Sequence, residues 1–244
     1  MPKPNSTLIV VVLDRSGSMN GIRHDTLGGF NSFLADQKKN PTDEARLTLV
    51  QFDHEYLVSY DNKPLADVPN LTPETYVPRG NTALLDAMGR AIVTTGEALK
   101  VMPEAERPEQ VVFLCITDGQ ENASREYTKA KIAEMVKHQT DVYQWNFVFL
   151  GANMDAIGEG ASMGVAAVNA MNFQASAQGM GVMYQAVSSN VDSYRTSRNA
   201  ASLSFTSAQR DANANPDDVD LKVLTESKVQ AAVNKNDSDS RPKN

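Results

Sequence analysis

Short apolar runs alternate along the chain with longer stretches in which apolar residues recur every three or four positions. Three runs are continuous: Thr7–Leu13, which is rich in valine and isoleucine, and the similar runs Val111–Ile116 and Asn146–Leu150. Such runs are typical of parallel strands that are covered on both faces. We therefore predict that each run forms a strand in the interior of a sheet.

Two neighbouring segments are expected to pair as a hairpin. Leu47–Phe52 alternates between apolar and polar residues, and Tyr56–Tyr60 follows it after the short polar turn Asp53-His54-Glu55. Two strands joined by a turn of this length pair antiparallel. The hairpin would supply one antiparallel edge strand, and Ala166–Phe173 is predicted to be a last edge strand.

Four stretches between these strands have apolar residues at the spacing of one helix face. They are Ile22–Lys39, Thr82–Val101, Glu126–His138 and Gly179–Tyr194. Strands that alternate with helices of this length favour an α/β fold. We predict a Rossmann-like three-layer sandwich, with a mostly parallel central sheet, one antiparallel edge strand and helices on both faces.

The composition of the chain changes after Arg195. Large apolar residues become sparse there, and Ser, Asn, Asp, Lys and Ala dominate. A segment of this kind has too little apolar surface to bury for the entropy lost on ordering it. We therefore predict one domain over residues 1–195 and a polar, flexible tail over residues 196–244, with a short helix near Val219–Val233.

Composition and charge indicate which classes of partner are disfavoured and in which compartment the protein is expected. The 244 residues carry a formal net charge of −7, which disfavours binding to nucleic acid or to an anionic membrane surface. The single cysteine, Cys115, lies in a predicted buried strand and is expected to be a structural thiol. The apolar run Leu8–Leu13 is too short for a signal peptide or a membrane span. The expected location is the cytoplasm.

Candidate chemistry begins directly after the first predicted strand, at Asp14-Arg15-Ser16-Gly17-Ser18. Asp14, Ser16 and Ser18 are spaced by two, so an extended turn can point all three side chains the same way. In open α/β sheets, ligands bind at the carboxyl ends of the strands. A carboxylate and two hydroxyls are hard oxygen ligands, which suit Mg²⁺, Ca²⁺ or Mn²⁺.

Two other segments are expected to reach the same edge of the sheet. The strand that contains Cys115 ends in Asp118-Gly119, and Thr82 precedes the second predicted helix. Each residue also has a simpler interpretation. Ser18 could be a helix N-cap, and Thr82 could be one with Asp86 completing a capping-box-like pair. Asp118-Gly119 could be an ordinary turn.

The three motifs together, in this order, resemble the metal-ion-dependent adhesion site of von Willebrand factor type A domains. The resemblance covers roughly Ser6–Phe173 together with the last predicted helix. It is similar to the bacterial or phage type that consists of a single intracellular domain. Asn81 differs from common family versions, in which a second glycine is frequent at this position; together with Asp86 it is a further candidate for orienting the site.

The resemblance implies a role for each matched residue. Ser16 and Ser18 would bind the metal directly, and Thr82 would bind it directly or through water. Asp14 and Asp118 would hold it mainly through waters. We expect a divalent cation, Mg²⁺ in the first place, with Ca²⁺ and Mn²⁺ as alternatives.

The resemblance also implies the kind of partner. The family leaves one coordination position open for an outside group, typically an Asp or Glu side chain of a protein partner. An ion with few directly bound carboxylates keeps much of its positive charge and attracts such an anion. Some related proteins work beside AAA+ ATPases of the MoxR type. The predicted function is therefore a metal-dependent protein-binding module.

Enzyme signatures are weak. Gly160-Ala-Ser162-Met-Gly164 matches a nucleophile elbow, but no histidine follows Ser162 to complete a triad. The chain has no phosphate-binding loop, and its three histidines are scattered in sequence. We predict no catalytic residue and no enzyme activity. Two alternatives stay open: a metal-dependent phosphohydrolase, and an assembly protein in which the metal only stabilises the fold.

Overall fold

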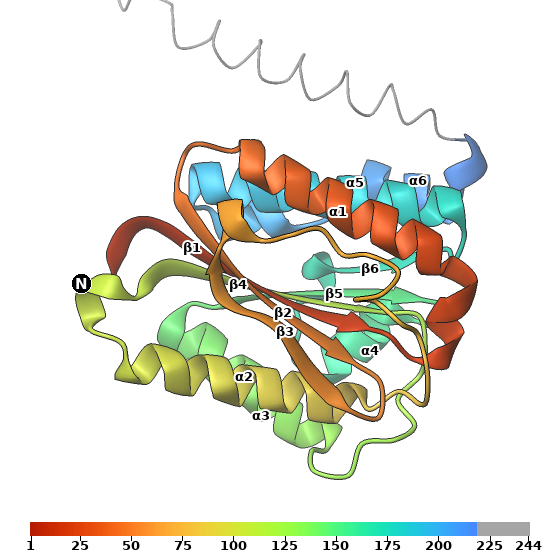
Figure 1. Cartoon of the computed structure of the whole chain (residues 1–244), viewed down its shortest axis with the longest axis horizontal. Coiled ribbons are helices and arrows are strands. Elements are labelled where there is room, and N and C mark those ends of the chain that lie inside the picture. Colours follow the sequence, from red (N-terminus) through yellow and green to blue (C-terminus); the bar gives the residue numbers. More distant parts are fainter. Residues whose placement is uncertain (219–244) are drawn as a thin grey trace, which may run out of the picture.

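The computed structural model describes residues 1–218, which form a six-stranded sheet with helices on both faces (Figure 1). The strands are ordered β3-β2-β1-β4-β5-β6. They are β1 (Lys3–Asp14), β2 (Glu44–Phe52), β3 (Tyr56–Pro64), β4 (Pro108–Thr117), β5 (Asn146–Ala152) and β6 (Ala170–Phe173). Among the strands of residues 1–218, only the pair β2–β3 is antiparallel. The predicted fold class is confirmed.

Strand β1 lies in the middle of the sheet, between β2 and β4. Its residues from Ser6 to Asp14 are all buried. Val10 and Val12 contribute to the core on one face of the sheet, whereas Val11 and Leu13 contribute to the core on the other. This burial on both faces explains why the strand reads as a continuous apolar run rather than an alternating one.

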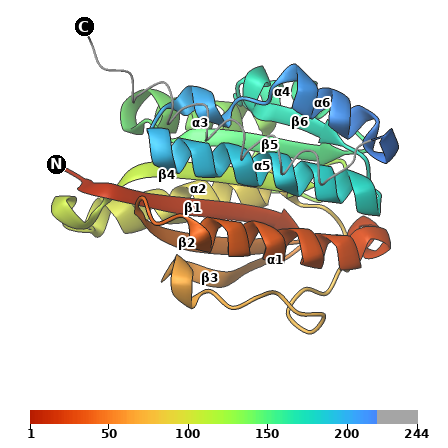
Figure 2. The same cartoon turned by 90° about the horizontal axis from the view of Figure 1, so that it is seen from above.

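The helices are divided between the two faces of the sheet. They are α1 (Arg23–Lys39), α2 (Leu84–Val101), α3 (Lys129–Tyr143), α4 (Ala156–Ser162), α5 (Ala177–Ser197) and α6 (Ser207–Ala214). Helices α1, α5 and α6 cover one face, and α2 and α3 cover the other. Figure 2 shows α1 and α5 lying side by side.

Helices α3 and α4 are two of those that differ from the sequence prediction. Helix α3 begins at Lys129 rather than Glu126, because Thr128 caps it by accepting a hydrogen bond from the Lys131 N–H. Helix α4 was not predicted; it has only seven residues, two of which are glycines. A helix this short carries too few apolar positions to establish a period of 3.6.

The packed part of the chain continues past the predicted domain boundary at residue 195. After α5, a 3₁₀ turn and then α6 follow. Leu203 and Phe205 are buried in the core between the sheet and α1 and α5, and the Phe205 N–H donates to the Val168 carbonyl at 2.8 Å. Two apolar side chains thus hold this polar segment in place. The predicted helix near Val219–Val233 lies outside the described residues.

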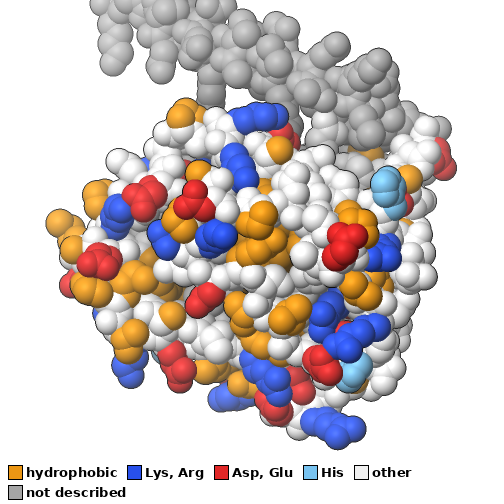
Figure 3. Space-filling view, in the orientation of Figure 1, with side chains coloured by type: hydrophobic (Ala, Val, Ile, Leu, Met, Phe, Trp, Pro, Cys, Tyr) orange, Lys and Arg blue, Asp and Glu red, His pale blue; other side chains and the backbone are white. Residues whose placement is uncertain are grey.

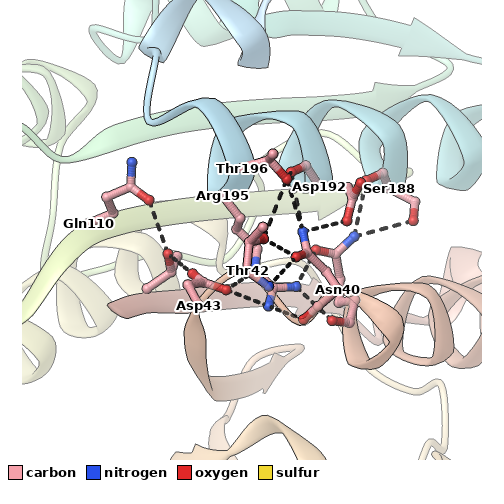
Figure 4. A network of polar contacts seen from close by, with 10 residues as sticks. Asn40, Thr42, Asp43, Gln110, Ser188, Asp192, Arg195 and Thr196 are labelled. Atoms are coloured by element: carbon pink, nitrogen blue, oxygen red, sulfur yellow. Dashed lines mark hydrogen bonds and ion pairs between the residues drawn. The ribbon is translucent and has the colours of Figure 1, made fainter. Parts of the chain in front are cut away.

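A buried ion pair joins the end of α5 to the segment directly before β2 (Figure 4). This segment lies at the amino ends of the parallel strands, opposite their carboxyl ends. Arg195 and Asp43 each have 1% of the side chain exposed, and they approach to 2.7 Å. Arg195 also donates to the carbonyl and side-chain oxygens of Gln37. Thr7 donates to the other oxygen of Asp43. The guanidinium and the carboxylate are therefore both satisfied although they are removed from water.

The single cysteine lies in the core, and the surface carries side chains of mixed character. Cys115 is buried in β4, as expected of a structural thiol. Figure 3 shows basic, acidic and apolar side chains intermixed on one face. Within residues 1–218, none of the helices is both long and apolar enough to cross a membrane.

Candidate metal centre

Three loops meet at the carboxyl ends of β1 and β4, and backbone hydrogen bonds join them. The loop after β1 is tied to the loop before α2, because the Gly17 N–H donates to the Gly80 carbonyl at 3.1 Å. The loop after β4 is tied to the same loop, because the Asn122 N–H donates to the Thr82 carbonyl at 3.1 Å. All three predicted segments are thereby brought to one edge of the sheet.

Asp14, the last residue of β1, has no exposed surface. One carboxylate oxygen accepts from the Ser16 N–H at 2.6 Å, and the other accepts from the Thr117 hydroxyl at 2.5 Å. The buried hydroxyl of Tyr76 donates to the Asp14 carbonyl at 2.7 Å. The carboxylate is therefore held from β4 and from its own loop, and the Asp14 backbone is held from the segment before α2.

Three hydroxyls converge on one point beside Gly119. The hydroxyl oxygens of Ser16 and Ser18 are 3.1 Å apart, and the Ser18 hydroxyl donates to Asp118 Oδ1 at 2.5 Å. A Cβ atom at Gly119 would lie 3.2 Å from Thr82 Oγ1, 3.3 Å from Ser18 Oγ and 3.9 Å from Ser16 Oγ. The space that a side chain would fill at Gly119 is therefore lined by hydroxyl oxygens from the other two loops.

The hydroxyls are not used for helix capping. Ser18 lies inside the 3₁₀ turn Gly17–Ile22, and the Ser16 side chain makes no capping hydrogen bond to that turn. Helix α2 begins at Leu84 with Ala83 as its N-cap, so Thr82 lies outside the helix. The capping interpretation of Ser18 and Thr82 is therefore wrong, and their hydroxyls stay available to a ligand.

Thr82 is positioned by side chains of the loop after β4. Its N–H donates to Asn122 Oδ1 at 2.9 Å, and the Leu85 N–H donates to Glu121 Oε2 at 3.0 Å. Neither Asn122 nor Glu121 was predicted to be part of this arrangement. Asn81, the expected orienting residue, is exposed.

Asp86 anchors the same loop from the first turn of α2. Its carboxylate accepts from the backbone N–H groups of three consecutive residues, 125 to 127. Burial opposes ionisation, but these three donors outweigh it and lower the pKa of Asp86. Asp86 thus fixes the loop that carries Asn122 rather than completing a capping box.

The two carboxylates of the site lie in a setting that disfavours negative charge. Burial raises the pKa of Asp14 to about 6, against hydrogen bonds from Thr117 and Ser16 that lower it, and the nearby Asp118 adds to the rise. Burial also raises the pKa of Asp118. A cation beside these groups would favour their charged forms. The Asp14 and Asp118 carboxylates are therefore suited to a site that holds a positive ion.

The donor set is hard and contains few carboxylates. Within residues 1–218, no group of three or more His, Cys, Asp or Glu side chains is gathered as a metal cluster. Hydroxyl oxygens would have to complete the coordination, and hard oxygens suit Mg²⁺, Ca²⁺ or Mn²⁺ rather than soft metals.

The rim of the site contains Asp53 and His54, which were not predicted as site residues. Asp53, predicted to lie in a turn, is fully buried. The side chain of the following residue, His54, is 48% exposed. Its ring lies against the backbone of Gly80, where a Cβ atom would come within 2.2 Å of His54 Nδ1. Gly80 has a φ of +67°, so a glycine suits both its conformation and this contact.

Ser162 does not form a nucleophile elbow. It is the last residue of α4, it is exposed, and its hydroxyl donates to the Glu159 carbonyl. A nucleophile elbow instead places its serine on a sharp turn between a strand and a helix. The chance interpretation of the Gly-x-Ser-x-Gly match agrees with this position.

The fold is shared with solved structures, although no protein-family model and no curated protein matches the sequence. Proximal thread matrix protein 1 from the mussel byssus, solved with a zinc-occupied MIDAS motif, has a TM-score of 0.50 at 15% identity, over 75% of this chain and 45% of its own. A von Willebrand factor type A protein from Catenulispora acidiphila has a TM-score of 0.50 at 16% identity, over 80% and 43%. The open conformation of the pilus adhesin SpaC from Lactobacillus rhamnosus GG has a TM-score of 0.57 at 11% identity, over 78% and 30%.

The fold of this chain is therefore that of a von Willebrand factor type A domain. The identities are low, so the likeness concerns the fold alone. The chain spans less than half the length of each of these three chains.

Proposed function

We propose that the chain is a metal-dependent protein-binding module, which engages an acidic side chain of a partner through a divalent cation. The observation that carries the proposal is the convergence of the Ser16, Ser18 and Thr82 hydroxyls beside Gly119. No local role in helix capping accounts for this convergence.

The residues of the site divide into two groups by chemistry, three hydroxyls and two carboxylates. Ser16, Ser18 and Thr82 would contact the ion directly, and Asp14 and Asp118 would hold it through water. Asp14 has no exposed surface, whereas Ser18 is exposed. The ion would therefore face solvent on the Ser18 side. When bound, it supplies a positive charge that a partner carboxylate can ligate in a partly desolvated setting.

The choice of ion follows from the donors. The zinc in the mussel protein belongs to that structure and supports a divalent cation at the corresponding motif of this fold. The donors of this chain are hydroxyl and carboxylate oxygens, which favour Mg²⁺, with Ca²⁺ and Mn²⁺ as alternatives. The single-domain intracellular type and a MoxR-type AAA+ ATPase as partner system remain predictions from the resemblance, and a cytoplasmic location remains a prediction from the composition and the N-terminal sequence.

A capture experiment tests the proposal. The full chain, immobilised, is incubated with candidate partners in Mg²⁺, in chelator, and in Mg²⁺ restored after chelator. We expect capture in both Mg²⁺ conditions and its loss in chelator. The variant Asp118→Ala is the matched control, since it should lose both the ion and the partner. Capture that persists after this variant has lost the ion would instead support an assembly role.

The proposal assigns no catalytic residue. Phosphohydrolase activity would need a general base beside the ion, and the matched motifs supply none. A panel of phosphoester and nucleotide substrates with Mg²⁺ or Mn²⁺ tests this directly. Turnover that Asp14→Ala abolishes would replace the binding proposal with an enzymatic one.

A further inference from the structure

Asp53 lies directly after β2, beside the candidate metal centre but outside it. It has no exposed surface. The preceding residue, Phe52, accepts a hydrogen bond through its carbonyl from the Arg15 N–H at 2.7 Å. A fully buried carboxylate needs partners for its charge, and those of Asp53 come from the loops that carry the proposed metal ligands.

The Asp53 carboxylate contacts both loops at once. Its Oδ2 atom accepts from Arg79 Nε at 3.0 Å and lies 3.1 Å from Arg15 Nε. Arg15 stands between Asp14 and Ser16, and Arg79 stands three residues before Thr82. One oxygen atom therefore joins the loop that carries the serine hydroxyls to the loop that carries the threonine hydroxyl.

The backbone of Asp53 strengthens the same connection. Its carbonyl accepts from the Ala83 N–H at 2.9 Å, immediately after Thr82. Its Oδ1 atom accepts from the Glu55 N–H at 2.6 Å, which fixes the direction of the carboxylate. The two loops are also joined directly, since the Arg79 N–H donates to the Arg15 carbonyl at 2.8 Å.

The charge of Asp53 is needed for this geometry. Arg15 is almost fully buried, and its guanidinium shares an acceptor with that of Arg79. Two guanidinium groups so close together repel one another unless a negative charge lies between them. Glu55 contacts Arg79 from the exposed side, but it is 3.8 Å from Arg15 and so compensates that charge less closely.

We propose that Asp53 is a positioning residue for the metal centre: it sets the distance between the Ser16–Ser18 loop and the Thr82 loop without touching the ion. This inference rests on the proposed function, because it concerns the same site. Residues that support metal ligands from outside change metal affinity about 10–100-fold when they are replaced.

The variant Asp53→Asn tests the inference in the full chain. Asparagine keeps an oxygen acceptor for the Glu55 N–H, but it lacks the charge and places an NH₂ donor where the guanidinium groups need an acceptor. We expect the Kd for Mn²⁺, measured by calorimetry, to rise about 10-fold or more. Circular dichroism should show that the fold is retained.

Asp43→Asn is the matched control. Asp43 is also a buried aspartate paired with a buried arginine, but it lies at the opposite edge of the sheet. We expect this variant to lose stability while its Kd for Mn²⁺ stays within about twofold of the wild type, because distant sites act independently. A general loss of stability would weaken binding in both variants.

The outcomes separate the inference from the proposed function. Equal Mn²⁺ affinity in the wild type, Asp53→Asn and Asp43→Asn would overturn the positioning role and leave the metal site in place. No Mn²⁺ binding by the wild type would overturn both. Should Asp53→Asn not fold, Arg79→Gln decides, because Arg79 is half-exposed and its loss releases only the Thr82 loop. An unchanged Kd in Arg79→Gln would then overturn the inference.

Discussion

The Ser18 hydroxyl donates a hydrogen bond to Asp118 Oδ1 at 2.5 Å, although the two residues are 100 positions apart in the chain. The contact joins the loop after β1 to the loop after β4, and these strands are neighbours in the sheet. Parallel neighbours present their carboxyl ends at the same edge, which is where open α/β sheets bind ligands. The pair therefore marks the place where the proposed ion would lie.

The first prediction concerns ion-dependent stability. An ion that binds only the native state stabilises it by about 2.7 kcal/mol at a concentration about 100 times its Kd. For a chain of this size, that corresponds to a rise in Tm of roughly 5–10 °C. We expect Mg²⁺ to produce such a rise in differential scanning fluorimetry, and Ser16→Ala combined with Ser18→Ala to remove it. The same rise in the double variant would place the ion elsewhere.

The second prediction concerns the donor to Asp14. Thr117→Val keeps the shape of the side chain but removes the hydroxyl that donates to the buried carboxylate. We expect the free energy of unfolding, measured by urea denaturation in chelator, to fall by about 1–3 kcal/mol, because a buried acceptor loses its partner. Thr117→Ser retains the hydroxyl and should lose less. Equal stability of the valine variant and the wild type would contradict this role.

The third prediction concerns the space beside Gly119. A methyl group there would lie within 3.4 Å of the hydroxyl oxygens of Thr82 and Ser18. We expect Gly119→Ala to lose most of the Mg²⁺-dependent rise in Tm, while its stability in chelator stays within about 1 kcal/mol of the wild type. The Gly119→Ala variant is therefore measured both in Mg²⁺ and in chelator. A full Mg²⁺ response would show that the ion does not use this space.

The fourth prediction concerns the contact between α1 and α5. A Cβ atom at Gly29 would lie 2.1 Å from the ring of Tyr184 on α5, whereas one at the adjacent Gly28 would meet nothing within 4 Å. We expect Gly29→Ala to lower the free energy of unfolding by about 1–3 kcal/mol through overpacking. Gly28→Ala should raise it by about 0.5–1 kcal/mol through helix propensity. Denaturation curves of the two variants provide the measurement, and equal effects would contradict close packing of the helices.

The sequence by itself determined the elements of the sheet and the motifs of the site. A strand that is buried on both faces has a continuous run of apolar residues, so the central strands could be predicted from these runs alone. The spacing of Asp14, Ser16 and Ser18 is a local property, and so is the position of Asp118 at the end of a strand. Helix α6 was not predicted, because only a few apolar side chains hold its segment against the core and the rest of the segment is polar.

Only the tertiary structure decided which polar groups meet. Thr117 became the partner of Asp14 because β4 pairs with β1, and Asn122 became the partner of Thr82 because the loop after β4 folds over the start of α2. Asp53 lies in the predicted turn, but only the order of the strands shows that its carboxylate lies between two arginines. Hydrophobic periodicity is a local property that can be read from the sequence. The partner of a buried charge depends instead on which distant loops the order of the strands brings together.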